Sequence, residues 1–201
     1  MLARVTRPTA ADDPLRVFLS WYDHAVASGV KEPDAVTLAT VGAGGAPRAR
    51  VVLYKGVSAE RLTFYTNYES AKGRELAADP RAALAFHWRE LARQVRVEGR
   101  AERLPPEESD AYFATRPRVA QLGAHASLQS RPLPARQVFA ERMAELEERF
   151  RDRAVPRPEG WGGYALTAER WELWIGHEYR LHERYEYVRA GDAWSFVLLY
   201  P

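Results

Sequence analysis

The stretch YRLHERYEY, residues 179–187, places Arg180, His182 and Arg184 at every second position. In a β-strand, alternate residues point to the same face of the sheet. Side chains that carry or can acquire positive charge repel one another on one face unless an anion lies opposite them. The stretch therefore predicts a strand with one face directed at an anionic ligand.

Other groups that can bind anions lie near the ends of predicted strands. Arg50 and Lys55 flank one strand, Tyr65 and Thr66 end the next, and Lys72 lies in the short helix that follows. Backbone N–H groups at the start of that helix, together with Lys72, could bind a phosphate. Taken alone, however, such a lysine is more often a solvated surface residue.

Several further polar and aromatic residues are ambiguous when each is taken alone. Gln94 lies on a strand face lined by Arg and Glu, and Gln129 lies in a loop. Tyr112 and Arg116 are one helical turn apart and would share a helix face. Trp174 fits a core or an interface as well as a ligand site. These residues become informative only through their arrangement along the chain.

Composition and missing motifs exclude several classes of function. The 201 residues have a formal net charge of +2 and no cysteine. The balanced charge argues against a nucleic-acid binder, and the lack of cysteine excludes disulfides and thiolate metal sites and favours a cytoplasmic location. We find no phosphate-binding glycine loop, zinc-ligand spacing or serine-hydrolase elbow. We also find no apolar run of membrane-spanning length. We therefore expect no metal, no nucleic acid and no membrane partner.

Hydrophobic periodicity predicts a mostly β protein with flanking helices, of the α+β class. It indicates helices over 14–30, 70–80, 105–116 and 135–153, an irregular loop over 123–134, and strands over 35–41, 48–56, 61–67, 81–88, 93–104, 161–176, 179–189 and 193–200. We count about seven strands, mostly in sequence-adjacent pairs with three or four helices between them, which favours an antiparallel sheet closed into a barrel. We expect a single domain over 14–201 after a mobile N-terminal segment, 1–13.

The order of the motifs resembles that of a known family. The segments RVVLYK, FYTN, SAKGREL, RQVRVEG, YFATRPR, QLGAHASLQS, WGGY and ELWIGHEYRLHERYEY occur in the order typical of the pyridoxine/pyridoxamine 5′-phosphate oxidase family, over roughly residues 12–201. The resemblance implies an FMN-binding antiparallel split β-barrel. It also implies a homodimer with two flavin sites at the subunit interface.

The resemblance also implies residue roles. The FMN would be bound by Arg50, Val51, Val52, Lys55, Tyr65, Thr66, Lys72 and Gln94, and from the other subunit by Gln129, Ser130, Trp174 and Arg184. Lys55, Tyr112 and Arg116 would bind the substrate 5′-phosphate. Arg180 and His182, the implied catalytic residues, would hold the pyridine ring against the flavin. The FMN would take a hydride from C4′ at its N5, and dioxygen would reoxidise it to give hydrogen peroxide.

The chain departs from the family pattern mainly on the substrate side. Ala71 stands where many members have Arg, Ala120 where a serine is usual, His125 where Trp is common, and Leu198 where Arg is usual. The N-terminus also lacks a basic segment found in some members. Two alternatives therefore stay open. One is a flavin oxidase of another small ring, such as a phenazine precursor. The other is a non-catalytic protein that binds vitamin B6 phosphate or flavin on the same barrel.

Overall fold

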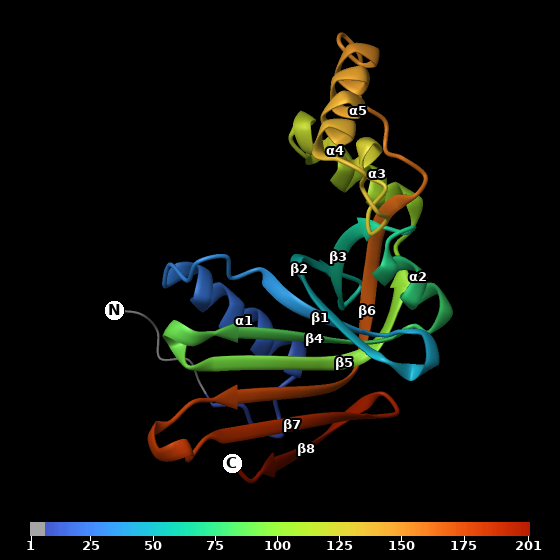
Figure 1. Cartoon of the computed structure of the whole chain (residues 1–201). Coiled ribbons are helices and arrows are strands. Elements are labelled where there is room, and N and C mark those ends of the chain that lie inside the picture. The colour runs from blue at the N-terminus through green and yellow to red at the C-terminus, as the bar shows by residue number, and fades with distance from the viewer. Residues whose placement is uncertain (1–6) are drawn as a thin grey trace.

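The computed structural model describes residues 7–201, and within them the chain forms an antiparallel barrel (Figure 1). Its strands are β1 (Ala35–Val41), β2 (Pro47–Ser58), β3 (Arg61–Asn67), β4 (Arg81–Trp88), β5 (Arg93–Arg103), β6 (Trp161–Ile175), β7 (Glu183–Ala190) and β8 (Ala193–Leu199). The strand order is β3-β2-β1-β4-β5-β6-β7-β8, and β3 also pairs with β6. That pairing closes the first six strands into a barrel and leaves β7 and β8 as an extension.

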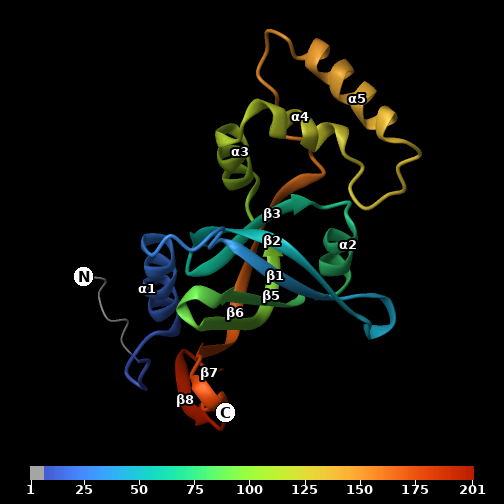
Figure 2. The same cartoon turned by 60° about the vertical axis from the view of Figure 1, so that its left-hand side comes forward.

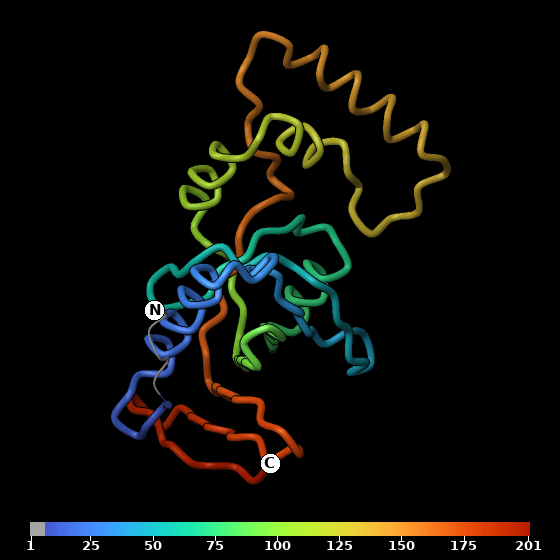
Figure 3. Tube along the Cα trace, turned by 90° about the vertical axis from the view of Figure 1, so that its left-hand side faces the viewer, coloured from blue at the N-terminus to red at the C-terminus, as the bar shows by residue number. Residues whose placement is uncertain are grey.

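The helices lie in two places around the barrel. They are α1 (Pro14–Ala27), α2 (Ala71–Ala78), α3 (Pro106–Thr115), α4 (Arg118–Ala126) and α5 (Arg136–Arg149). α1 and α2 lie beside the barrel, whereas α3, α4 and α5 stand together beyond one end of it (Figures 1 and 2). We refer to α3–α5 as the helical cover. β7 and β8 lie at the end of the molecule away from α4 and α5 (Figures 1 and 3).

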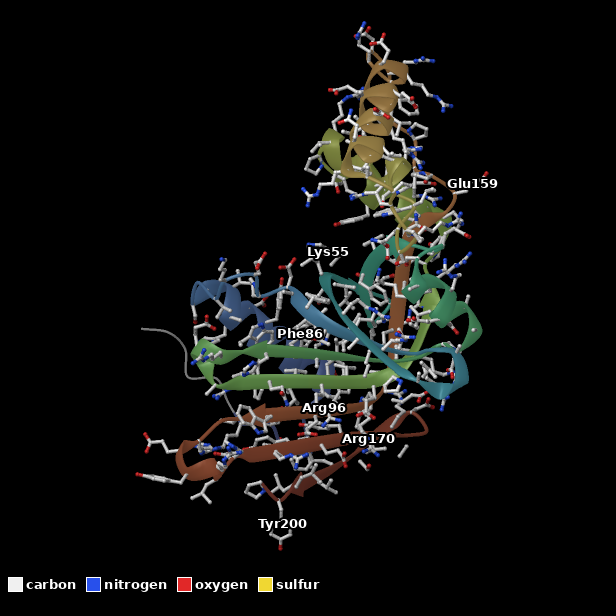
Figure 4. The ribbon with its side chains drawn as sticks, viewed as in Figure 1. Lys55, Phe86, Arg96, Glu159, Arg170 and Tyr200 are labelled. Carbon is white, nitrogen blue, oxygen red and sulfur yellow. The ribbon has the colours of Figure 1, made fainter. Side chains whose placement is uncertain are left out.

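The barrel core is rich in aromatic side chains. Phe18 of α1 is fully buried, and its ring lies 4.9 Å from that of Phe86, 5.4 Å from that of Tyr54 and 5.6 Å from that of Trp171. Figure 4 labels Phe86 on β4. Burying such side chains contributes about 1.5–3 kcal/mol each, so this packing fixes α1 against the barrel.

A second, smaller cluster holds the helical cover to the barrel. It contains Phe113, Leu122, Phe150, Val155 and Trp161, the first residue of β6. Because it joins α3, α4 and the end of α5 to the start of β6, it sets the position of the cover above β2 and β3.

The segment 179–189 is not one strand, and the prediction of a single strand there is wrong. Tyr179 and Arg180 have φ values of 55° and 62° within a short turn, Glu178–Arg180, and β7 begins only at Glu183. Residues in this left-handed region turn the chain and cannot continue a strand. Arg180 and His182 therefore precede the strand, and only Arg184 lies on it.

The predicted loop over 123–134 is wrong for its first four residues. Helix α4 extends to Ala126, with Pro117 at its N-cap position. Leu122 and Ala126, four residues apart, are both buried, and Leu122 belongs to the cluster that holds the helical cover to the barrel. Each of the eight predicted strand ranges corresponds to one strand, so residues 7–201 have eight strands and the count of about seven is one too low.

Residues 1–6 of the N-terminal segment expected to be mobile lie outside the described residues. In residues 7–13, Arg7 donates two hydrogen bonds of 2.7 Å to the Glu183 carboxylate. Tyr187 donates from its hydroxyl to the Thr9 carbonyl at 2.8 Å, and Asp13 caps α1. These contacts join the described part of this segment to β7 and α1. Within residues 7–201, no helix has the length and apolar character needed to span a bilayer.

Candidate active site

A cleft of about 680 Å³ lies between the barrel and the helical cover. Its walls come from β2, β3, α2, α3, α4, the chain after α4 and the start of β6. The lining residues include Arg50, Val51, Val52, Lys55, Tyr65, Thr66, Lys72, Tyr112, Arg116, Ala120, Gln129, Ser130 and Trp161. Figure 4 shows Lys55 on the side of β2 that faces the helical cover. Four of these side chains are cationic, so the cleft suits an anion.

Lys72 forms one cationic group with Arg50. Its Nζ lies 3.2 Å from both Thr66 Oγ1 and Gln129 Oε1. Burial, and then the charge of Arg50, lowers the Lys72 pKa. Arg50 is already neutralised, because its Nη2 lies 2.6 Å from Glu75 Oε2. Lys72 is therefore the group here that an added phosphate would stabilise most.

The start of α2 positions Lys72. Ser70 is the N-cap, and its Oγ accepts a hydrogen bond from Gly73 N–H at 3.2 Å. Position 73 needs glycine, because a Cβ there would lie 2.1 Å from the Tyr68 carbonyl oxygen. This tight entry places Lys72 in the first turn of α2, beside the end of β3.

Arg116 forms a second cationic group, with aromatic neighbours. Its guanidinium lies 4.5 Å from the Trp161 ring centroid. Its Nη1 is buried and has no hydrogen-bond partner within residues 7–201, and burial lowers its pKa. A buried donor without an acceptor costs about 1–3 kcal/mol, so this atom is suited to an anionic acceptor supplied by a ligand.

Stacked aromatic rings line the cleft beside these polar groups. Tyr65 and Tyr112 stack at 3.8 Å between centroids with an angle of 15° between planes. Trp161 stacks on Tyr65 at 5.6 Å. Burial raises the pKa of Tyr65, so its hydroxyl stays neutral and can donate a hydrogen bond. The stack gives the cleft a planar wall.

The remaining predicted site residues form a second group outside the cleft. Gln94, Trp174 and Arg184 are directly opposite one another across β5, β6 and β7, so they form one row on the outer face of the sheet. His182 lies beside this row, with its ring 4.6 Å from that of Trp174. Arg180, exposed in the preceding turn, lies on the same segment.

Buried charge pairing fixes the row. Arg184 Nε lies 2.9 Å from Glu172 Oε1 and its Nη2 3.1 Å from Oε2, a two-point contact. Arg96 also donates to the Glu172 carboxylate, with 3.0 Å between its Nη1 and Glu172 Oε2. The Glu172 partnership raises the Arg184 pKa. The His182 ring is held as well, because His177 N–H donates to its Nδ1 at 3.2 Å.

The structure brings the predicted residues together in two sets rather than one. The cleft holds Arg50, Val51, Val52, Lys55, Tyr65, Thr66, Lys72, Tyr112, Arg116, Gln129 and Ser130, whereas Gln94, Trp174, Arg180, His182 and Arg184 lie outside it. Gln129 and Ser130, which the resemblance assigns to the site of the other subunit, line the cleft of their own chain, and the Gln129 amide oxygen contacts Lys72 there. Their role in a dimer stays a prediction. The chain after α4 folds back toward α2, which allows this contact.

Sequence reasoning missed four residues that shape these sets. Trp161 starts β6 opposite Asn67 at the end of β3, a position that only the barrel closure reveals. Asp34, Glu75 and Glu172 are the carboxylates paired with Lys55, Arg50 and Arg184. The residues around these three carboxylates in the sequence do not distinguish them from acidic residues exposed to solvent. The residues 7–201 contain no cluster of three or more potential metal ligands.

A closed antiparallel barrel, a helical cover and a cleft between them lined by four cationic side chains define a split-barrel protein. A family model described as pyridoxamine 5′-phosphate oxidase matches residues 22–150. A second, described as the C-terminal dimerisation region of pyridoxine 5′-phosphate oxidase, matches residues 161–201. The chain therefore belongs to the pyridoxine/pyridoxamine 5′-phosphate oxidase family.

Individual relatives are similar over nearly their whole length. The chain is 54% identical to a pyridoxine/pyridoxamine 5′-phosphate oxidase of Rubrobacter xylanophilus, over 96% of this chain and 88% of the relative. It is 50% identical to a pyridoxine/pyridoxamine 5′-phosphate oxidase of Cupriavidus pinatubonensis, over 100% of this chain and 95% of the relative. Among solved structures, PhzG from Burkholderia lata in complex with tetrahydrophenazine-1-carboxylic acid matches with a TM-score of 0.90 and 31% identity, over 100% of this chain and 98% of that one.

Proposed function

We propose that this protein is an FMN-dependent oxidase that converts pyridoxine 5′-phosphate and pyridoxamine 5′-phosphate to pyridoxal 5′-phosphate in the cytoplasm, with 14–201 as a single domain. The observation that carries the proposal is the pair of cations, Lys72 and Arg116, that burial destabilises in one cleft. Two separate cationic groups suit two phosphates, one on a cofactor and one on a substrate. The relatives of 46–54% identity that carry this oxidase name support the same activity.

The cleft fits FMN on its chemistry. Lys72, Arg50 and the Gln129 amide offer donors to a phosphate, and the free Nη1 of Arg116 offers one to a second. When bound, FMN supplies a two-electron acceptor that takes a hydride from the substrate C4′ and passes the electrons to dioxygen, giving hydrogen peroxide. The protein binds both rings and orients them.

The role of the protein side chains follows from their hydrogen bonds. Lys55, Tyr112 and Arg116 bind the substrate 5′-phosphate, and the fixed charge of Arg116 makes that phosphate a condition of tight binding. His182 accepts the His177 N–H at Nδ1, so the neutral ring carries its proton at Nε2. That Nε2–H, with the Arg180 guanidinium, is available to hold the pyridine ring.

A homodimer completes the site in this proposal. One chain supplies the cleft, and the partner supplies the row of Gln94, Trp174 and Arg184 together with its neighbour His182. Val51 and Leu53 of β2 are 65% and 45% exposed beside the cleft, which is unusual for apolar strand residues and suits an interface. The match of residues 161–201 to a dimerisation region supports this arrangement.

Anaerobic reduction of the bound flavin tests the proposed oxidase. We expect the FMN-loaded protein to lose its yellow colour when pyridoxine 5′-phosphate is added without oxygen. Readmitted oxygen should restore the colour and release hydrogen peroxide. Unchanged flavin absorbance with both phosphorylated substrates would refute the oxidase and leave a non-catalytic binder.

The similarity to PhzG makes oxidation of a reduced phenazine precursor the second candidate. It predicts turnover without a substrate phosphate. The unpartnered Nη1 of Arg116 suits an anionic acceptor, and either a substrate phosphate or the carboxylate of a phenazine precursor could supply one, so this atom does not separate the two candidates. The rates with pyridoxine 5′-phosphate and with a reduced phenazine carboxylate, measured side by side, distinguish the two candidates.

A further inference from the structure

Two of the four cations in the cleft are paired with a carboxylate of their own chain. Arg50 is paired with Glu75, and Lys55 is paired with Asp34 through a 2.7 Å contact between Nζ and Oδ2. Lys72 and Arg116 form no ion pair within residues 7–201. The ligand-binding role of Lys55 therefore competes with a partner that is already in place.

Asp34 is fixed in position by the strands around it. It directly precedes β1, and its carbonyl oxygen accepts the Tyr54 N–H at 2.8 Å, in the register that pairs β1 with β2. The neighbouring Pro33 carbonyl accepts the buried Trp88 indole N–H at 3.0 Å. The Asp34 carboxylate is thus held beside Lys55, and it is not among the side chains that line the cleft.

We propose that Asp34 is a positioning residue that holds Lys55 in the phosphate-free protein and competes with the substrate phosphate for its ammonium group. This inference rests on the proposed function, in which Lys55 binds that phosphate. Both side chains are about one quarter exposed, at 27% and 24%, so the pair is partly screened by water. Such a pair is worth up to about 1 kcal/mol, which limits the competition to about fivefold in affinity.

The substitution Asp34→Asn tests the inference because asparagine keeps the shape and the oxygen acceptor but not the charge. We expect KM for pyridoxine 5′-phosphate to fall about three- to fivefold with kcat little changed. If Asp34 only supports the fold, the KM of the Asp34→Asn variant should stay unchanged or rise. Either of those results would overturn the proposal.

A control variant distinguishes the effect of the charge at Asp34 from the effect of the protein's net charge. Asp192→Asn removes the same unit charge from an exposed position in the turn between β7 and β8. We expect it to leave KM unchanged. If it lowered KM as much as Asp34→Asn, net charge rather than the Asp34–Lys55 pair would be responsible, and the proposal would be wrong.

A binding measurement keeps the test independent of turnover. Calorimetric titration with pyridoxal 5′-phosphate should show the same three- to fivefold gain for Asp34→Asn, and the gain should vanish in a Lys55→Met background. A gain that persists without Lys55 would contradict the proposed competition. If the wild-type protein binds the phosphate but oxidises nothing, the oxidase fails while the titration still decides the role of Asp34.

Discussion

At Arg116 the chain holds a cation that is destabilised by burial and has one unsatisfied donor. We expect Arg116→Met to weaken binding of pyridoxal 5′-phosphate about ten- to hundredfold, since a hydrogen bond to a charged group is worth about 1.5–3 kcal/mol. The ligand-free protein should not lose stability, because methionine keeps the apolar contact with Trp161 and removes the desolvated charge. Thermal unfolding with and without the ligand measures both effects.

The control for this prediction is Arg89→Met, at an exposed position in the turn after β4. It should leave the ligand-induced rise in Tm unchanged. An Arg116→Met variant that is strongly destabilised without ligand, yet gains as much stability from the ligand as the wild type, would show that Arg116 is structural.

The charged residues of the cleft could be predicted from the sequence, but their partners could not. Lys55 and Lys72 are conspicuous because lysine is rare in this chain, and both lie near strand ends. Asp34 pairs with a residue 21 positions away and Glu75 with one 25 positions away. Such pairs depend on strand register and helix placement, which the types of the individual residues do not encode.

At the scale of elements, the pairing of β5 with β6 depends on a glycine. The register shifts between Glu98 and Gly99, and a Cβ at position 99 would lie 1.9 Å from the Thr167 carbonyl oxygen. Because that atom belongs to the backbone of β6, it cannot move aside easily. We expect Gly99→Ala to lower the free energy of unfolding by at least about 2 kcal/mol, measured by urea denaturation.

Gly123 in α4 is the matched control, since a Cβ there meets nothing within 4 Å. Gly123→Ala should raise the free energy of unfolding by about 0.4–1 kcal/mol, because alanine restricts the unfolded chain. Equal effects of the two substitutions would mean that the close approach at position 99 relaxes without cost.

The contacts of Glu183, at the start of β7, should make the stability of the folded protein depend on pH. Hydrogen bonds from Arg7, together with Tyr185 and His177, lower the pKa of Glu183 to about 2, from about 4.3 in an unfolded chain. The folded state therefore binds fewer protons than the unfolded state between these values, so stability falls as pH falls through this window. The Arg7 side chain is 65% exposed, so water screens the ion pair and keeps the effect on stability small.

Urea unfolding of Glu183→Gln and the wild type checks this expectation. The variant should be less stable at pH 6, and the difference should shrink by pH 3, where the unfolded carboxylate is mostly protonated. A difference that stays constant between pH 6 and pH 3 would exclude the ion pair as its cause.

Periodicity located most elements but could not separate a strand from a turn with the same alternation. The predictions over 35–41, 61–67 and 81–88 are confirmed at both ends. The alternation of Arg180, His182 and Arg184 mimics a strand, yet the positive φ values of Tyr179 and Arg180 break it. Residues 117–122 carry too few apolar positions to indicate the start of α4, which is stabilised by packing within the cover.

For the whole molecule, a closed antiparallel barrel was predictable, but the pair of strands that closes it was not. β6 pairs with β3, β5 and β7, and the pairing with β3 joins strands that are about a hundred residues apart. Only that closure brings Trp161 to the end of β3 and thereby places Tyr65 and Arg116 in one cleft. The split of the site residues into a cleft set and a row on β5–β7 is likewise a property of the assembled fold.

That split leads to a test by subunit complementation. In the proposed dimer, each site takes its cleft from one chain and its row from the other. We therefore expect Arg116→Met and Arg184→Met homodimers each to be strongly impaired in oxidation. A heterodimer of the two variants has one site with both substitutions and one with neither. Random co-assembly should then restore about a quarter of the wild-type sites, because half of the dimers are mixed and half of their sites are intact.

Co-expression with two different affinity tags, followed by purification of the mixed dimer, makes the measurement direct. The purified heterodimer should have about half the wild-type kcat per dimer with a wild-type KM, because its one intact site has every original contact. If cleft and row instead served the same site within one chain, every site in the heterodimer would carry one substitution. Activity no higher than that of the two homodimers would therefore show that each chain builds its site alone.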